Sequence, residues 1–237
     1  KFWTSLPNGG TELNPANDTI SINVMNCLSP YVGTYSVGGV NPDFPTLTDA
    51  FNAMESCGLS GHVILKLASG TYSQLVLPKI TGLSETKTIT IESATGNAAD
   101  VVFTYNAIGA TDNYVVRFNG SQYMGLKKVS IIALNSTNGR AVDYVAQASY
   151  TVLESCIIQS PVVATSTVAP IYSYLLLNNY NTIKNNTISG GYYGIYIYGT
   201  SSTARSKGFT IEGNSITDYS YYGIYSYYQD SLTIKNN

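Results

Sequence analysis

The charged residues that come closest to a catalytic set are Arg140, Asp143 and Glu154, in the middle of the chain. General acid–base hydrolysis of a glycosidic bond needs two carboxylates at a defined separation, one of them with a shifted pKa. Adjacent coils of a repeat would bring these residues to one wall, but nothing in the sequence fixes their separation. Solvated charges on a surface are the simpler interpretation. We therefore predict no catalytic residue, and keep these three as fallback candidates.

A second candidate surface is aromatic. The chain has 21 tyrosines and 6 phenylalanines, which suggests rings kept half in water rather than in a core. Strand alternation places isoleucines inward and tyrosines outward. The predicted ligand-binding residues form two outward columns, Tyr172, Tyr196 and Tyr225 in the first and Tyr174, Tyr198 and Tyr227 in the second. Further tyrosines at the turns are more exposed candidates: Tyr192, Tyr193, Tyr221 and Tyr222.

Two aromatic columns on a neutral wall suit sugar rings or another flat partner that is both apolar and polar. The alternative is that the columns only shield the sheet and stabilise the stacking of coils. Both interpretations stay open at this point.

Neither a metal site nor a cofactor is predicted. The cysteines, at positions 27, 57 and 156, include no CxxC pair, which disfavours zinc. One disulfide between Cys27 and Cys57 with a buried Cys156 thiol is one interpretation, and three buried thiols is the other. The single histidine, His62, begins a strand, where a structural hydrogen bond is more typical than a role as a base.

The charge and hydropathy patterns exclude two classes of partner. Charged residues make up 11% of the chain and the formal net charge is −2, so no basic surface for nucleic acid is expected. No run of 18 apolar residues occurs, so we expect no membrane span.

The elements that must position these residues repeat along the chain. The phrase Thr-Ile-Lys-Asn-Asn at residues 182–186 returns, with small changes, at 210–214 and 233–237. Self-similarity at this period predicts a solenoid, in which each repeat buries its apolar side against the next. The last asparagines of the three phrases would stack at one corner and hydrogen-bond to each other and to turn backbone. The predicted equivalent inward positions are Leu126, Val152, Ile183, Ile211 and Ile234.

Residues 46–57 are predicted as an α-helix. Thr46 and Asp49 have the spacing of a capping box, and Gly58 is placed to end the helix in a left-handed conformation. One apolar stripe follows the helical period and contains Leu47, Ala50, Phe51 and Met54. Such a helix in front of a first buried strand at 62–67 would cover the open apolar end of the solenoid. Further strands are expected at 75–77, 88–92, 101–104, 114–118 and 126–132.

The first thirty residues fit no repeat. An alternating stretch at 18–24 follows a Pro-Asn-Gly-Gly turn and is typical of a strand. Residues 1–30 are predicted as the end of a β-sandwich-like module, or as an N-terminal extension along the solenoid. Residues 31–237 are the solenoid, and because the last phrase stops within a coil, we expect it to continue beyond 237 or to meet a neighbouring subunit.

From about residue 38 to 237 these repeats resemble the right-handed parallel β-helix of the pectin-lyase-like superfamily. The opening, with its helix, strand and Gly70-Thr71-Tyr72, resembles that of pectin methylesterases. It is more similar to β-helix modules of large secreted or surface proteins of Bacteroidetes, where a phrase like Val-Gly-Gly-Val-Asn-Pro-Asp-Phe at 37–44 precedes the capping helix. The resemblance implies an all-β, right-handed parallel β-helix solenoid with an N-terminal capping α-helix.

The enzyme sites of that superfamily are not found in this sequence. The methylesterase phrases are absent, there is no Asp-Asp pair, and His62 does not lie in the Gly-His-Gly phrase of polygalacturonases. The acidic residues after position 90 are too scattered to indicate the Ca²⁺ cluster of pectate lyases. The predicted glycosylation candidates, Thr19 and Ser231, lie in phrases that resemble the Asp-Ser/Thr-aliphatic motif on which Bacteroidetes O-glycosylate exported proteins.

The resemblance therefore implies a non-catalytic module of a secreted or cell-surface protein. It would act as a rigid stalk or adhesin, with polysaccharide or cell-surface glycans as expected partners. Two alternatives stay open. The first is a polysaccharide lyase or glycoside hydrolase whose catalytic coils lie partly beyond 237, and the second is a structural element of a fibre or surface layer.

Overall fold

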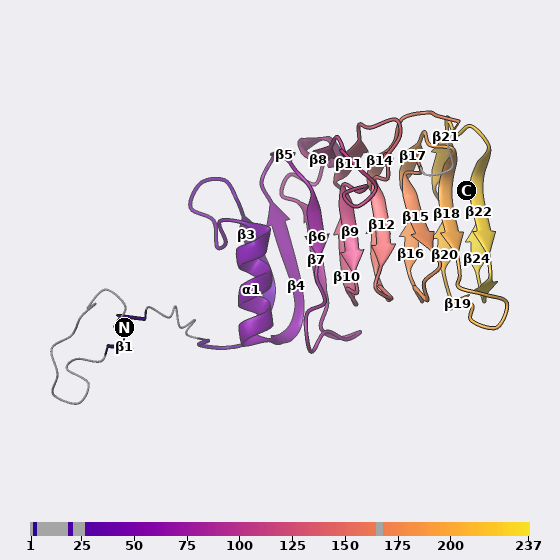
Figure 1. The fold of residues 1–237 in the computed structure, drawn as a ribbon. Helices are drawn as coiled ribbons and strands as arrows, with labels where there is room; N and C mark the ends of the chain where they lie inside the picture. Colours follow the sequence, from indigo (N-terminus) through magenta and orange to yellow (C-terminus); the bar gives the residue numbers. More distant parts are fainter. Residues whose placement is uncertain (1, 4–18, 21–26, 165–167) are drawn as a thin grey trace, which may run out of the picture.

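Figure 1 shows the computed structural model, which describes residues 2–3, 19–20, 27–164 and 168–237. Three parallel sheets form the walls of a solenoid, and each full coil adds one strand to each sheet. This arrangement confirms the predicted parallel β-solenoid. Sheet 1 consists of β3 (Tyr31–Val37), β4 (Leu59–Leu67), β7 (Ile89–Ser93), β10 (Met124–Lys127), β13 (Val152–Glu154), β16 (Thr182–Lys184), β20 (Thr210–Glu212) and β24 (Thr233–Lys235).

The other two walls follow the same order along the chain. Sheet 2 consists of β5 (Gly70–Tyr72), β8 (Val101–Tyr105), β11 (Ser130–Ala133), β14 (Ile157–Gln159), β17 (Thr187–Ser189) and β21 (Ser215–Thr217). Sheet 3 consists of β6 (Leu75–Leu77), β9 (Val116–Asn119), β12 (Val142–Val145), β15 (Ile171–Tyr174), β18 (Tyr193–Tyr198) and β22 (Tyr222–Tyr227). Two short pairs complete the strands, β1 (Phe2–Trp3) with β2 (Thr19–Ile20) and β19 (Ser206–Lys207) with β23 (Gln229–Asp230).

The core is a stack of apolar side chains that point inward from all three sheets. Along sheet 1 one inward row contains Leu126, Leu153, Ile183, Ile211 and Ile234. All but the last are fully buried, and burial of each such side chain contributes roughly 1.5–3 kcal/mol. The prediction that Val152 belongs to this row is wrong, because Val152 pairs with Gly125 and Leu153 points inward. Both residues are apolar, so hydropathy alone did not fix the register, and a shift of one residue turns every side chain to the other face.

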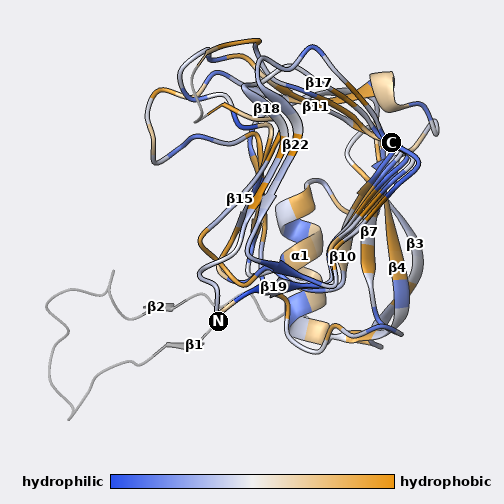
Figure 2. Ribbon diagram, turned by 90° about the vertical axis from the view of Figure 1, so that its right-hand side faces the viewer, coloured by the Kyte–Doolittle hydropathy of each residue, from blue (hydrophilic) through white to orange (hydrophobic). Residues whose placement is uncertain are grey.

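The helix α1 (Leu47–Cys57) is confirmed with its capping box, in which Thr46 and Asp49 bond to each other's backbone N–H. Gly58 has the expected positive φ of 68°, but its ψ of −179° is extended rather than helical. In Figure 1 α1 lies at the N-terminal end of the solenoid, and in Figure 2, which looks along the axis, it lies within the outline of the coils. The side chains that it buries against the core are Leu47, Ala50, Phe51, Ala53 and Met54.

The strand expected at 62–67 lies within β4, which is the first buried strand, as predicted. Strand β3 precedes α1 and pairs with β4 in sheet 1. Because β3 is an edge strand, most of its residues are exposed and show no clean alternation. The single strand expected at 126–132 is two strands, β10 and β11, since the chain turns a corner at Lys128, where φ is 51°.

Cys27 and Cys57 form a disulfide that joins the segment before β3 to the end of α1, while Cys156 is a free, buried thiol. This is the first of the two interpretations of the cysteines. The strand expected at 18–24 falls mainly outside the described residues, apart from β2.

Candidate functional site

The outer face of sheet 3 carries the predicted tyrosine columns. Parallel pairing places Tyr196 between Tyr172 and Tyr225, and Tyr198 between Tyr174 and Tyr227. The isoleucines that alternate with them on β18, Ile195 and Ile197, are fully buried. Each strand therefore holds its two tyrosines outward at a spacing fixed by the sheet.

The first column is a closed stack. The ring centroids of Tyr172 and Tyr196 are 5.0 Å apart with planes at 13°, and those of Tyr196 and Tyr225 are 5.2 Å apart at 5°. Rings in this arrangement stabilise each other by about 0.5–1.5 kcal/mol per pair. Their faces cover one another, and Tyr172 is only 9% exposed. This column is a rigid stack beside the second column. It presents ring edges and hydroxyl groups to solvent rather than open ring faces.

The second column is more open. The ring planes of Tyr174 and Tyr198 meet at 54°, with ring centroids 5.4 Å apart. The ring planes of Tyr198 and Tyr227 meet at 32°, with ring centroids 5.2 Å apart. Tyr174 is 43% exposed and Tyr227 is 46% exposed. The turn tyrosines extend the same surface, since the ring of Tyr193 lies 5.2 Å from that of Tyr225. We call this set the tyrosine surface: Tyr172, Tyr174, Tyr192, Tyr193, Tyr196, Tyr198, Tyr221, Tyr222, Tyr225 and Tyr227.

Two hydroxyl groups in the first column, those of Tyr196 and Tyr172, have raised pKa values. Burial raises the pKa of Tyr196, and neighbouring tyrosine rings raise it further. Burial also raises the pKa of Tyr172, although the nearby Arg140 guanidinium opposes that shift. A protonated phenol both donates and accepts hydrogen bonds. These two hydroxyl groups are therefore protonated at neutral pH, and they can match hydroxyl-bearing partners.

The first column continues into charged residues in the preceding coils, because Tyr172 pairs with Asp143 and Asp143 with Arg117. Asp143 is 2% exposed. Its Oδ2 lies 2.8 Å from an Nη of Arg117 and its Oδ1 lies 3.6 Å from an Nη of Arg140. The Arg140 guanidinium also lies 3.5 Å from the centroid of the Tyr172 ring. Burial raises the pKa of Asp143, while the two arginines oppose the shift.

Glu154 lies on a different wall. It belongs to sheet 1, between Lys127 at 3.4 Å and Lys184 at 3.5 Å. It is one member of an outward column in which positive and negative side chains alternate from coil to coil: Lys66, Glu92, Lys127, Glu154, Lys184, Glu212 and Lys235. The structure thus brings Arg140 and Asp143 together but not Glu154. Arg117 is not among the residues predicted from the sequence. It could have been predicted as a partner of Asp143, because it lies one coil before Asp143.

The remaining predicted residues have simpler surroundings. The Nδ1 atom of His62 lies 3.0 Å from the hydroxyl oxygen of Thr88, and Ser231 is exposed next to Asp230. Thr19 lies in β2. Among the residues that the structure describes, no group of three or more His, Cys, Asp or Glu side chains is placed to hold a metal ion. No helix in the described ranges is long and apolar enough to cross a membrane.

Comparison with known proteins supports the fold. Residues 173–237 match the family model described as a right handed beta helix region. No curated protein matches the chain. Two solved structures are similar, each with a TM-score of 0.49. A pectin methylesterase from carrot is 11% identical, over 79% of this chain and 54% of that one. A pectin methylesterase from Aspergillus niger is 15% identical, over 88% of each chain.

This chain spans about half the length of the carrot enzyme. At these TM-scores and identities, neither likeness carries an argument about activity. The family match and the three parallel sheets confirm the predicted fold: the described part of the chain from β3 to β24 is a right-handed parallel β-helix.

Proposed function

We propose that this chain is a non-catalytic module of a secreted or cell-surface protein, which acts as a rigid stalk or adhesin and binds glycans on the tyrosine surface. The observation that carries the proposal is the second column, whose tilted rings, exposed at Tyr174 and Tyr227, stand beside the stacked rings of the first. Aromatic rings with neutral hydroxyl groups offer both the apolar and the polar contacts that sugars use.

The repeat of the fold favours an extended ligand. The tyrosines of each column recur once per coil, at the strand spacing of about 4.8 Å. A polymer that lies along the solenoid axis would meet equivalent side chains on β15, β18 and β22. The stacked first column keeps those side chains in place, so little conformational entropy is lost on binding.

The state of the acidic residues supports a role without catalysis. Both carboxylate oxygens of Asp143 face guanidinium groups, and the other fallback carboxylate, that of Glu154, lies in the charged column of another sheet. Glycosidic hydrolysis with two carboxylates needs both beside the same bond.

A glycan array tests the proposal with the wild-type chain and the double variant Tyr198→Ala/Tyr227→Ala. We expect the wild type to bind a set of neutral glycans and the double variant to bind them at least tenfold more weakly, since two aromatic contacts are lost. Tyr35→Ala is a matched control, because Tyr35 is a half-buried tyrosine at the opposite end of the solenoid. Equal binding by the double variant, or no binding by the wild type, would contradict the proposal.

An assay for new reducing ends, run on the glycans that bind, tests the non-catalytic half separately. We expect no release above a boiled sample. Release that is lost in an Asp143→Asn variant would make the chain an enzyme and would overturn that half.

A further inference from the structure

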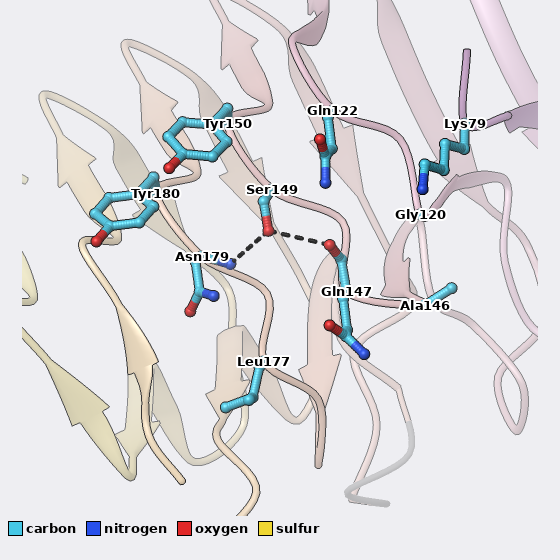
Figure 3. A pocket seen from close by; sticks show the side chains of 10 residues that line it. All are labelled: Lys79, Gly120, Gln122, Ala146, Gln147, Ser149, Tyr150, Leu177, Asn179 and Tyr180. Carbon is cyan, nitrogen blue, oxygen red and sulfur yellow. Dashed lines mark hydrogen bonds between the residues drawn. The ribbon is translucent and has the colours of Figure 1, made fainter. Parts of the chain in front are cut away.

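A cavity separate from the tyrosine surface lies at the corner where the chain passes from sheet 3 to sheet 1 (Figure 3). Its volume is about 400 Å³, within the range of about 300–1,000 Å³ that is typical of small-molecule sites. None of the tyrosines of the tyrosine surface lines it. The side chains that give it chemical character are Lys79, Gln122, Gln147, Asn179, Tyr150 and Tyr180.

Two rows of side chains build one wall of the cavity. Gln122 is bridged to Ser149 in the next coil, and the Asn179 N–H donates to Ser149 Oγ at 3.1 Å, so these three form a polar row. The adjacent row is a ladder of three tyrosines, with ring centroids 4.7 and 4.9 Å apart and planes at 7° and 15°. Its members are Tyr123, Tyr150 and Tyr180.

The backbone conformation at this corner does not require tyrosine. All three ladder residues have a φ of 54–58°, a left-handed conformation that carries a steric cost for any residue with a Cβ. Lys128 and Ser155 adopt the same φ at another corner, so the turn accepts unrelated side chains. The next position of the ladder is Gly208, where a Cβ would lie 2.4 Å from Cδ1 of Tyr180. The turn conformation therefore does not explain why tyrosine occupies all three positions of the ladder.

Several hydrogen-bonding groups of the cavity are unused within the chain. In the part that the structure describes, the side chains of Lys79, Gln122 and Gln147 make no hydrogen bond or ion pair. Asn179 Oδ1 accepts from the Lys207 N–H at 2.8 Å, which leaves its Nδ2 group free for a ligand. No carboxylate and no arginine occurs among the described residues that line the cavity.

We propose that this cavity binds a saccharide that carries a sulfate or phosphate ester. A lysine acts as a point charge that suits a sulfate or phosphate oxyanion. The described residues that line the cavity include no arginine, the side chain that would pair with a planar carboxylate through two parallel hydrogen bonds. The amide N–H groups supply further donors to the ester oxygens. The amide carbonyls and the exposed tyrosine hydroxyls remain for the hydroxyl groups of the sugar ring.

The test uses one sugar ring with four substituents at C6: glucose, glucose 6-sulfate, glucose 6-phosphate and glucuronate. Each is titrated into the isotopically labelled chain, and the dissociation constant is read from NMR chemical shifts. We expect one or both esters to bind at least tenfold more tightly than glucose and glucuronate. Lys79→Met should remove that preference, and the preferred ester identifies the ligand as sulfated or phosphorylated.

Lys235→Met is the matched control, because Lys235 is an exposed lysine on the outer face of sheet 1. It should keep the wild-type preference for the esters. Tyr198→Ala/Tyr227→Ala should also keep that preference, so the cavity proposal can fail or succeed independently of glycan binding on the tyrosine surface. Equal binding of all four sugars, no binding of any, or esters that bind Lys79→Met as tightly as the wild type would overturn the proposal.

Discussion

Asn186→Ala is expected to lower the free energy of unfolding by about 3 kcal/mol. Asn186 is 2% exposed, and its Nδ2 donates to the Leu153 carbonyl at 3.1 Å and to Asn214 Oδ1 at 2.9 Å. Its Oδ1 accepts from the Cys156 N–H at 2.8 Å. Alanine removes all three bonds and leaves buried backbone groups unpaired, at about 1 kcal/mol or more each.

Urea denaturation measures this change, and Asn237→Ala is the control. Asn237 belongs to the same ladder and accepts from Asn214 Nδ2 at 2.8 Å, but it is exposed in this structure, so water can replace its bonds. We expect a loss of about 1 kcal/mol there. If both variants lost the same free energy, burial of the ladder would not be what stabilises the coils.

The coil before Asn186 shows how the ladder begins. Cys156 takes the place of the asparagine there, and its buried Sγ lies 3.3 Å from the Glu154 carbonyl oxygen. Burial raises the pKa of the Cys156 thiol to about 12, so it remains protonated at neutral pH and is a poor nucleophile. Cys156 is thus a structural residue of the corner.

The second large effect is expected for Arg117→Met, which should lower the free energy of unfolding at pH 7 by about 3 kcal/mol. Removing one partner of a buried ion pair leaves a charge without full compensation. Asp143 would keep only Arg140, whose Nη lies 3.6 Å away. Lys127→Met is the control, because Lys127 and Glu154 form a more exposed pair, and such pairs contribute about 0–1 kcal/mol.

The loss in Arg117→Met should depend on pH. Burial already raises the folded-state pKa of Asp143, and the loss of one opposing guanidinium raises it further. A raised carboxyl pKa favours the folded state below the ordinary pKa, and that contribution is lost as the pH rises through the folded pKa. The difference between variant and wild type should therefore shrink at acidic pH. A difference that stays constant would mean that Asp143 is not the group left uncompensated.

Much of the fold was predictable because its signals are local. The repeated phrase ending in Asn186, Asn214 and Asn237 predicted the corner ladder, which the amide contacts confirm. The capping box predicted α1, and alternation predicted which residues of β18 point inward. The capping box and the alternation depend on neighbours within a few residues, whereas the ladder was predictable because its phrase recurs once per coil.

Contacts between coils were less predictable, since the corners vary in length. Val152 and Leu153 are both apolar, so hydropathy does not determine which of them points inward. Spacing alone likewise does not show that Glu154 and Asp143 belong to different sheets. The Arg117–Asp143 pair and the Lys-Glu column join residues one coil apart, a distance over which sequence spacing alone does not fix the register.

Hydroxyl-radical footprinting of the chain, with and without a neutral glycan that it binds, is the most direct test of the proposed glycan surface. Oxidation of each tyrosine is read by mass spectrometry. We expect the glycan to reduce oxidation at Tyr174, Tyr198 and Tyr227 and to leave Tyr150 and Tyr180 unchanged. Unchanged oxidation at the first three, or protection confined to the corner ladder, would contradict a glycan site on the tyrosine surface.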